Sequence, residues 1–187
     1  TRYELFLRET RTYEIIEDVK NFRSEIGVLF LNSYNRDVLT KMFDDNRLTY
    51  TSLFKARPHI FVSKSNPLAK HEAVSLEDLE DFPYLSYDQG IHNSFYYSEE
   101  ILSQIPHKKS IVVSDRATLF NLLIGLDGYT IATGILNSNL NGDNIVSIPL
   151  DIDDEIDIVY LKHEKATLSK MGEKFLDNLV KEVTFDN

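Results

Sequence analysis

Residues 9–31 read ETRTYEIIEDVKNFRSEIGVLFL, and the change of apolar spacing within this stretch decides the fold class. Apolar residues at helical spacing occupy its first part: Ile15, Ile16, Val19 and Phe22. Residues 26–31 are apolar throughout, as in a central parallel strand covered on both faces. Because residues 3–7 alternate ahead of the helix, the stretch predicts a strand, a helix and a second strand, a βαβ unit.

Short strands and helices continue to alternate along the rest of the chain. Further extended segments are expected at 48–62, 84–87, 109–113, 129–133, 144–149 and 156–161. Further helices are expected at 35–45, at 95–104, from Asp115 towards Gly128, and at 169–183. This order predicts an α/β fold with a mostly parallel sheet, in which a ligand site lies in loops at the carboxyl ends of strands. Those loops are 9–12, 31–35, 87–95, 114–116 and 133–135.

The composition excludes several classes of protein. The chain has 187 residues, a formal charge of -10 and no cysteine. Its length fits one domain or two small lobes, and 42% hydrophobic residues are enough to bury a core. The lack of cysteine excludes disulfide scaffolds, thiol nucleophiles and cysteine-ligated metal sites. The acidic balance argues against broad contact between this segment and nucleic-acid phosphates.

Nothing in the sequence predicts a membrane segment or a secretion signal. The longest unbroken apolar run, residues 26–31, is far shorter than the roughly 20 residues of a membrane helix. The first residues, TRYELFLRET, lack the basic, apolar and small-residue layout of a signal peptide. We therefore expect a soluble, cytoplasmic chain without a membrane partner.

The sequence also lacks the local patterns of common catalytic and cofactor sites. It has no glycine-rich phosphate loop, no GxSxG motif and no HxxxH or HExxH spacing. The acidic run 151–157 lacks the spacing of an EF-hand, so a solvated turn is the preferred interpretation and calcium the alternative. We predict no catalytic residue, no metal ligand and no cofactor.

Polar residues stand instead at the expected starts of helices: Thr10, Thr12, residues 92–94 and Asp115. A helix N-terminus offers unpaired N–H groups and partial positive charge, so two of them facing across a cleft can bind an anion. Plain N-capping is the alternative for each residue. Several of these positions fall on the same side of the predicted sheet, which favours a cleft.

At this point the residues resemble those of a known family. The segment ETRTYEIIEDVKNFRSEIGVLF, residues 9–30, is similar to a strand-loop-helix-strand segment of LysR-type transcriptional regulators. That segment has a glutamate, a Ser/Thr loop, a helix and an acidic residue before an apolar strand. Glu9, Thr12 and Glu25 occupy the corresponding places.

A second stretch, LFKARPHIFVSKSNPLAKHEAVSLEDLEDFPYLSY at 53–87, resembles the turn and helix motif of the same family. Asn66 stands where the family usually has histidine, followed by Pro67. The helix residues of the motif are present: Ser75, Leu76, Asp78 and Leu79. A third stretch, 113–134, looks like the family's helix and glycine turn but departs from it at residues 126–129 and 133–134.

The resemblance implies two Rossmann-like subdomains joined by two crossover strands, as in periplasmic binding proteins. One lobe would hold residues 1–50 and 145–187 and the other 55–140, with crossovers at 50–56 and 133–148. The family's winged helix-turn-helix is absent, and the chain begins at what would be the second strand of the effector domain. The resemblance further implies a homo-oligomer, a dimer or tetramer, that reaches DNA only through a domain absent from this chain.

The resemblance also implies a small effector in the cleft between the lobes. The strand-end loops and the family's effector-contacting positions together give ten candidate residues: Thr10, Thr12, Phe30, Leu31, Asn93, Ser94, Phe95, Asp115, Arg116 and Thr133. Arg116 and the helix N-termini favour an anionic or zwitterionic effector, and Phe30 and Phe95 favour an apolar body.

The leading hypothesis is a ligand-sensing regulatory domain of a transcription factor. Two alternatives share the scaffold, a solute-binding protein of a transporter and an enzyme. The absence of a signal sequence disfavours the first alternative. The second would need an acid/base pair in the cleft, and the sequence offers only Asp115 with Arg116, a pair that also fits an ion pair or a helix cap.

Overall fold

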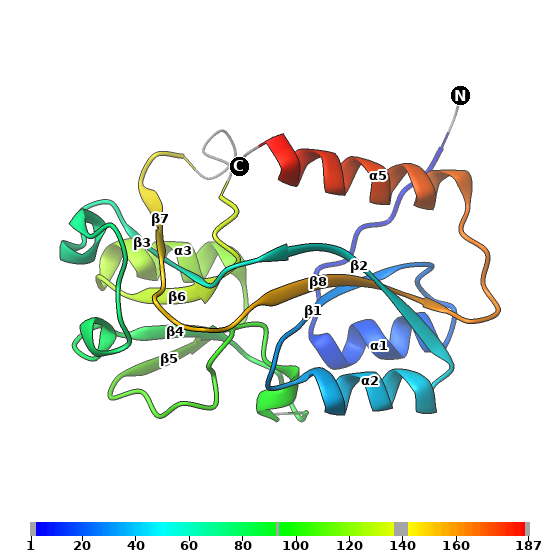
Figure 1. Ribbon diagram of the computed structural model, residues 1–187, viewed down its shortest axis with the longest axis horizontal. Helices are drawn as coiled ribbons and strands as arrows, with labels where there is room; N and C mark the ends of the chain where they lie inside the picture. Colours follow the sequence, from blue (N-terminus) through cyan, green and yellow to red (C-terminus); the bar gives the residue numbers. More distant parts are fainter. Residues whose placement is uncertain (1–2, 93, 137–141, 186–187) are drawn as a thin grey trace.

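The chain forms two lobes, each built on its own sheet, in a computed structural model that describes residues 3–92, 94–136 and 142–185 (Figure 1). The first lobe has a three-stranded sheet of order β1-β8-β2, and the second a five-stranded sheet of order β5-β4-β6-β3-β7. The first sheet comprises β1 (Gly27–Leu31), β2 (Leu48–Ala56) and β8 (Ile156–His163). The second comprises β3 (His59–Ser63), β4 (Tyr84–Tyr87), β5 (Ser110–Val113), β6 (Tyr129–Ala132) and β7 (Ile145–Pro149).

Helices cover both sheets. In the first lobe α1 (Thr12–Lys20) and α2 (Arg36–Asp45) lie on one side of the sheet, and α5 (Lys170–Phe185) lies on the other (Figure 1). In the second lobe α3 (Arg116–Gly125) packs on β3, β4, β5 and β7. Three short 3-10 helices complete the description: η1 (Pro67–Lys70), η2 (Glu77–Leu79) and η3 (Phe95–Tyr97). None of the helices in the described ranges has both the length and the apolar composition needed to cross a membrane.

Two connections cross between the lobes, in agreement with the predicted two-subdomain α/β class. β2 continues into β3 through Arg57 and Pro58, so the crossover segment expected at 50–56 lies within β2. β7 leads into β8 through residues 150–155.

The second crossover lies later in the sequence than predicted. The sequence places it at 133–148 and assigns 145–187 to the first lobe, but β7 pairs with β3, with Ile148 opposite Ile60. Residues 145–149 therefore belong to the sheet of the second lobe. The side chains of Ile148 and Ile60 are both buried in the core of the second lobe, and their packing holds β7 in that lobe.

The prediction of a mostly parallel sheet is wrong. β8 is antiparallel to both β1 and β2, and β3 is antiparallel to both β6 and β7. In the described chain, parallel pairing is limited to β4 with β5 and β6 among the named strands. An apolar run reports that both faces of a strand are covered and carries no information about direction, so β1 could be mistaken for a central parallel strand.

The strand predicted at residues 3–7 is also absent, because residues 3–11 are irregular. Most of the apolar side chains of this segment face solvent, with Phe6 85% exposed and Leu7 81% exposed. β1 is hydrogen-bonded to β8 alone and is an edge strand, and residues 3–11 do not pair with its open edge. Alternation of apolar residues therefore predicts a strand only where the segment also pairs with a neighbouring strand.

The helix predicted at residues 95–104 is reduced to the single turn of η3. The chain beyond it forms turns, and Leu102 adopts a positive φ of 61°, which a helix does not allow. Ile101 and Glu100 are both buried by these turns. The segment is therefore folded around two buried side chains instead of presenting one apolar face.

Glu100 is a buried carboxyl group in the second lobe. The Tyr87 backbone N–H donates to its Oε1 at 2.8 Å, and its Oε2 has no partner among the described residues. Burial raises the pKa of Glu100 from 4.5 to about 8, against the lowering effect of the Tyr87 hydrogen bond. Between about pH 4.5 and pH 8, Glu100 thus stays protonated in the folded protein, whereas the unfolded chain has lost this proton.

We predict that Glu100→Gln stabilises the protein more at pH 8 than at pH 5. The raised pKa means that wild-type stability from this group declines as pH rises from about 4.5 to about 8, on the order of a few kcal/mol over that window. Glutamine keeps a hydrogen-bond acceptor for Tyr87 and cannot ionise. Urea unfolding of both proteins at pH 5 and pH 8 checks this, and a difference in unfolding free energy that does not change with pH would contradict it.

Candidate functional site

Two adjoining cavities lie along the junction of the lobes. The first, of about 280 Å³, is lined on one side by the N-terminal segment and the start of α1, and on the other by the ends of β4 and β5 and the start of α3. The second, of about 330 Å³, lies between the N-terminal segment, α1 and β1. Glu9, Thr10 and Glu99 line both cavities. Together these cavities form the interlobe cleft, and both lobes contribute to its walls.

The N-termini of α1 and α3 meet at the first cavity. Asp115 caps α3, since its Oδ1 accepts from the Thr118 backbone N–H at 2.9 Å. This hydrogen bond is the main cause that lowers the pKa of Asp115. The cap predicted at Thr12 is one residue off, because Arg11 is the N-cap residue of α1 and makes no side-chain cap bond. The start of α1 thus faces the cleft without a side-chain acceptor on its own N–H groups.

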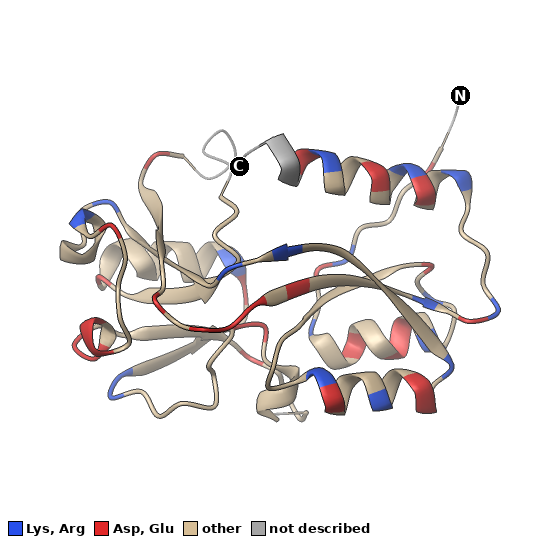
Figure 2. Ribbon diagram, in the orientation of Figure 1, with Lys and Arg blue, Asp and Glu red and all other residues tan. Residues whose placement is uncertain are grey.

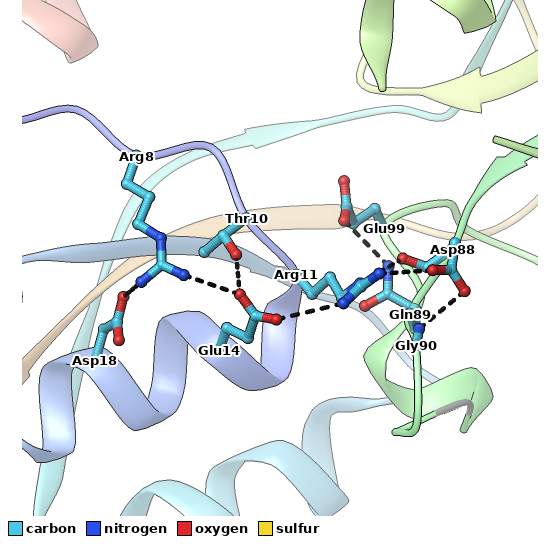
Figure 3. Close-up of polar contacts among 9 residues, drawn as sticks. All are labelled: Arg8, Thr10, Arg11, Glu14, Asp18, Asp88, Gln89, Gly90 and Glu99. Carbon is cyan, nitrogen blue, oxygen red and sulfur yellow. Dashed lines mark hydrogen bonds and ion pairs between the residues drawn. The ribbon is translucent and has the colours of Figure 1, made fainter. Parts of the chain in front are cut away.

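Arg11 connects the first lobe to the second across this cleft (Figure 3). Its Nε donates to the Asp88 backbone oxygen at 3.0 Å, and its Nη2 lies 2.6 Å from Asp88 Oδ2. The Gly90 backbone N–H donates to Asp88 Oδ1 at 2.9 Å and is the main cause that lowers the pKa of Asp88, with Arg11 adding to it. A side chain at Gly90 would collide with Arg11, and Gly90 has a φ of +63°, so glycine suits both constraints.

A chain of polar groups holds Arg11 from the other side (Figure 3). Glu14 Oε1 lies 3.5 Å from Arg11 Nη1, and Glu14 Oε2 accepts from the Thr10 hydroxyl and from Arg8. The Thr10 hydrogen bond is the main cause that lowers the pKa of Glu14. Arg8 also pairs with the buried Asp18 at 2.6 Å. The N-terminal segment is thereby tied to α1 along the edge of the cleft.

Aromatic rings make a second set of contacts between the lobes. The Tyr13 ring of α1 stacks on His92, with ring centroids 3.5 Å apart and planes 16° apart. Tyr34, just before α2, stacks on Tyr96 of η3 with centroids 4.9 Å apart. The Tyr97 hydroxyl donates to Met42 Sδ at 3.5 Å. The side chains of His92, Tyr96 and Tyr97 therefore contact the first lobe at α1 and around α2.

Burial perturbs two acidic side chains of the cleft wall. It raises the pKa of Tyr87 to about 12 and raises the pKa of Glu99, and in each case loss of solvent is the main cause. The charge of Glu9 adds to both shifts. The Gln89 side-chain N–H donates to Glu99 Oε1 at 3.0 Å and offsets part of the effect on Glu99.

The structure brings five of the predicted contact residues to the interlobe cleft: Thr10, Thr12, Phe30, Asp115 and Arg116. Thr12 is largely buried, and its hydroxyl makes no hydrogen bond with the described residues. The Arg116 guanidinium lies 5.1 Å from the centroid of the Phe120 ring.

The other predicted residues lie elsewhere or are not described. Leu31 is fully buried in the core of the first lobe, because β1 points it at α1 and β8, and it is not retained among the proposed contacts. Ser94 accepts from the Tyr96 backbone N–H at the start of η3, Phe95 is 57% exposed, and Thr133 accepts from Ile135. Asn93 lies outside the described residues.

Several residues of the cleft were not among the ten candidate contacts: Glu9, Arg11, Glu14, Tyr87, Asp88, Glu99 and Ser114. All but Glu14 and Glu99 lie within strand-end loops that the sequence had already indicated. Their charges gave no local signal, since Arg11 and its partner Asp88 are 77 positions apart. Glu99 was not identified because the sequence predicts a helix at residues 95–104, where the structure has turns beyond η3.

The acidic run before β8 is held by protein side chains. Figure 2 shows acidic positions along this crossover. Arg36 lies 3.1 Å from Asp157, Lys55 lies 2.6 Å from Glu155, and Asn32 donates to Asp154 at 3.2 Å. Over the described ranges, no group of three or more His, Cys, Asp or Glu side chains is arranged to hold a metal ion.

Comparisons with known proteins agree with this architecture. The sequence matches the family described as LysR substrate binding domain over residues 2–184. Among solved structures, the chain is similar to HinK, a LysR family transcriptional regulator from Pseudomonas aeruginosa, at 15% identity and a TM-score of 0.63. That match covers 94% of this chain and 58% of HinK, so the chain spans less than two thirds of that regulator.

Two effector-bound domains are similar to the same degree. The effector binding domain of QuiR, solved with shikimate, has 18% identity and a TM-score of 0.62, over 92% of this chain and 78% of that one. The BenM effector binding domain, solved with its effector benzoate, has 18% identity and a TM-score of 0.61, over 94% of this chain and 76% of that one. A comparison with curated protein sequences gives no match. The match over residues 2–184, together with the two-lobed fold, shows that this chain belongs to the LysR substrate binding domain family.

Proposed function

We propose that this chain senses a small effector bound in the interlobe cleft and is the regulatory part of a LysR-type transcription factor. The observation that carries the proposal is the pair of cavities whose walls come from both lobes, with the N-termini of α1 and α3 facing them. A ligand in such a cleft contacts both lobes at once. It is therefore sensitive to how far the lobes are closed.

The effector would act by changing how far the two lobes are closed. The contacts of Arg11 with Asp88 and of Tyr13 with His92 exist only when the lobes are close together. A ligand that binds the closed form more tightly shifts the population towards it, by its difference in affinity for the two forms. Couplings of this kind typically amount to about 1–3 kcal/mol, a 5- to 150-fold change in affinity.

The output would pass to parts of the protein outside this chain. We propose that the chain acts in a cytoplasmic homo-oligomer, that DNA is bound by a separate domain, and that the chain itself performs no catalysis. Membership of a regulator family supports this. The effector complexes of QuiR and BenM support a small organic ligand in this kind of domain.

We predict that Thr12→Val lowers effector affinity about fivefold to tenfold, because it removes a hydroxyl that lies in the cavity wall without a protein partner while keeping the side-chain shape. Calorimetry of both proteins against a panel of carboxylic acids, amino acids and amines measures this. Thr51→Val is the matched control, since Thr51 is exposed on β2 and lines neither cavity. Equal affinity of wild type and Thr12→Val for every bound compound would remove Thr12 from the site.

We also predict that Asp88→Asn favours the open form of the free protein, because it breaks the ion pair with Arg11 across the cleft. Small-angle scattering of the free protein should show a larger radius of gyration for the variant. Glu80→Gln is a matched control, since it breaks the exposed ion pair with Lys108 inside the second lobe. Superimposable scattering curves of wild type and Asp88→Asn would show that this ion pair does not hold the lobes together.

A further inference from the structure

The wall of the first cavity carries more carboxylates than cations. Its acidic residues are Glu9, Glu14, Asp88, Glu99 and Asp115, and its basic residues are Arg11 and Arg116. This balance is the reverse of what an anionic effector would need. The partners of each carboxylate show which of them are satisfied within the protein.

Three of the five carboxylates are satisfied. Asp88 and Glu14 both contact Arg11, and Glu14 also accepts from Thr10. Asp115 accepts from Thr118 as the cap of α3. These groups have no need of a ligand.

Glu9 and Glu99 are the remaining two, and both line both cavities. Among the described residues Glu9 makes no hydrogen bond or ion pair, and Glu99 accepts only from Gln89. Burial raises the pKa of Glu99, and the charge of Glu9 adds to this shift. A second acidic group nearby makes the charge of Glu99 harder to keep without a cation.

Gln89, which donates to Glu99, has a side-chain oxygen that accepts no hydrogen bond from the described residues. Its side chain is only 4% exposed, its N–H donates to Glu99, and its Oε1 has no partner among the described residues. Figure 3 shows this amide together with Glu99, Arg11 and Asp88. A buried amide oxygen without a donor is costly, so Gln89 Oε1 has unused capacity to accept a hydrogen bond.

We propose that the effector carries a protonated amine, which binds against Glu9 and Glu99 in the interlobe cleft. An ammonium group is a donor of up to three hydrogen bonds and accepts none, which matches the unpartnered carboxylate of Glu9, the carboxylate of Glu99 and a nearby amide oxygen. An anionic group at the same place would add acceptors and like charge. The inference rests on the proposed function, because it takes the cleft to be the effector site.

The rest of the effector has room in the second cavity, whose wall is more apolar. Ile15, Val28, Leu29 and Phe30 line it next to Glu9 and Glu99. An organic amine with an apolar body of small size fits this combination. A zwitterion is also accommodated, with its carboxylate towards the N-termini of α1 and α3, whereas a purely anionic effector would leave Glu9 and Glu99 without a cation.

Four probes of similar shape test the charge requirement. Benzylamine is a cation, phenylalanine a zwitterion, benzyl alcohol neutral and benzoate an anion. NMR titrations of the isotope-labelled chain at pH 7 report both the affinity and the residues that respond. We expect benzylamine to perturb residues 9–12 and 99 and to bind at least about tenfold more tightly than benzyl alcohol and benzoate, the preference that about 1.4 kcal/mol gives.

Charge-neutral variants locate the contact. Glu9→Gln and Glu99→Gln should each reduce the preference for benzylamine about tenfold. Glu9 is exposed on an irregular segment, so its variant leaves the fold intact. Glu72→Gln is the control, because it removes one negative charge from an exposed position that lines neither cavity.

The outcomes separate this inference from the proposed function. Benzoate binding in the cleft more tightly than benzylamine keeps the cleft as the effector site and overturns the amine. The same conclusion follows if benzylamine binds there with unchanged affinity in both variants. If none of the four probes perturbs the cleft at millimolar concentration, the result counts against both the amine and the effector site.

Discussion

The two lobes are joined along the described chain by two short connections, at 57–58 and 150–155, so noncovalent contacts across the cleft decide how they sit. The ion pair of Arg11 with Asp88 is central among these contacts, because Arg11 also belongs to the polar chain that ties the N-terminal segment to α1. In this contact the positive charge of Arg11 is paired with carboxylates of the cleft wall. The carboxylates left over therefore set the chemistry that a bound molecule must supply.

Sequence periodicity identified the elements that bury a clear apolar face. The strand at 26–31 and the start of α3 at Asp115 were predicted within a residue or two, because burial and capping are local properties. Strand direction, and the sheet to which residues 145–149 belong, depend on partners distant in the sequence and left no local trace. The segment 3–7 shows the same limit, since its residues alternate but do not pair with the open edge of β1.

The location of the cleft could be predicted, but the charge of its wall could not. Loops at strand ends pointed to Thr10, Thr12 and Asp115, and these residues do line the cleft. The pairing of Arg11 with Asp88 required two chain segments to come together. Glu99 reaches the cleft wall because the chain beyond η3 forms turns in place of the predicted helix. The expectation of an anionic or zwitterionic effector rested on Arg116 and the helix N-termini, without the carboxylates that line the same cavity.

Pulsed electron spin resonance between two labels tests the central claim, that ligand binding closes the lobes, most directly. The chain has no cysteine, so Lys41→Cys on α2 and Ser110→Cys on β5 place one label on each lobe at exposed positions. The account predicts a broad distance distribution for the free protein, which narrows and shifts when a cleft ligand saturates it. A ligand that binds in the cleft and leaves this distribution unchanged would contradict the account.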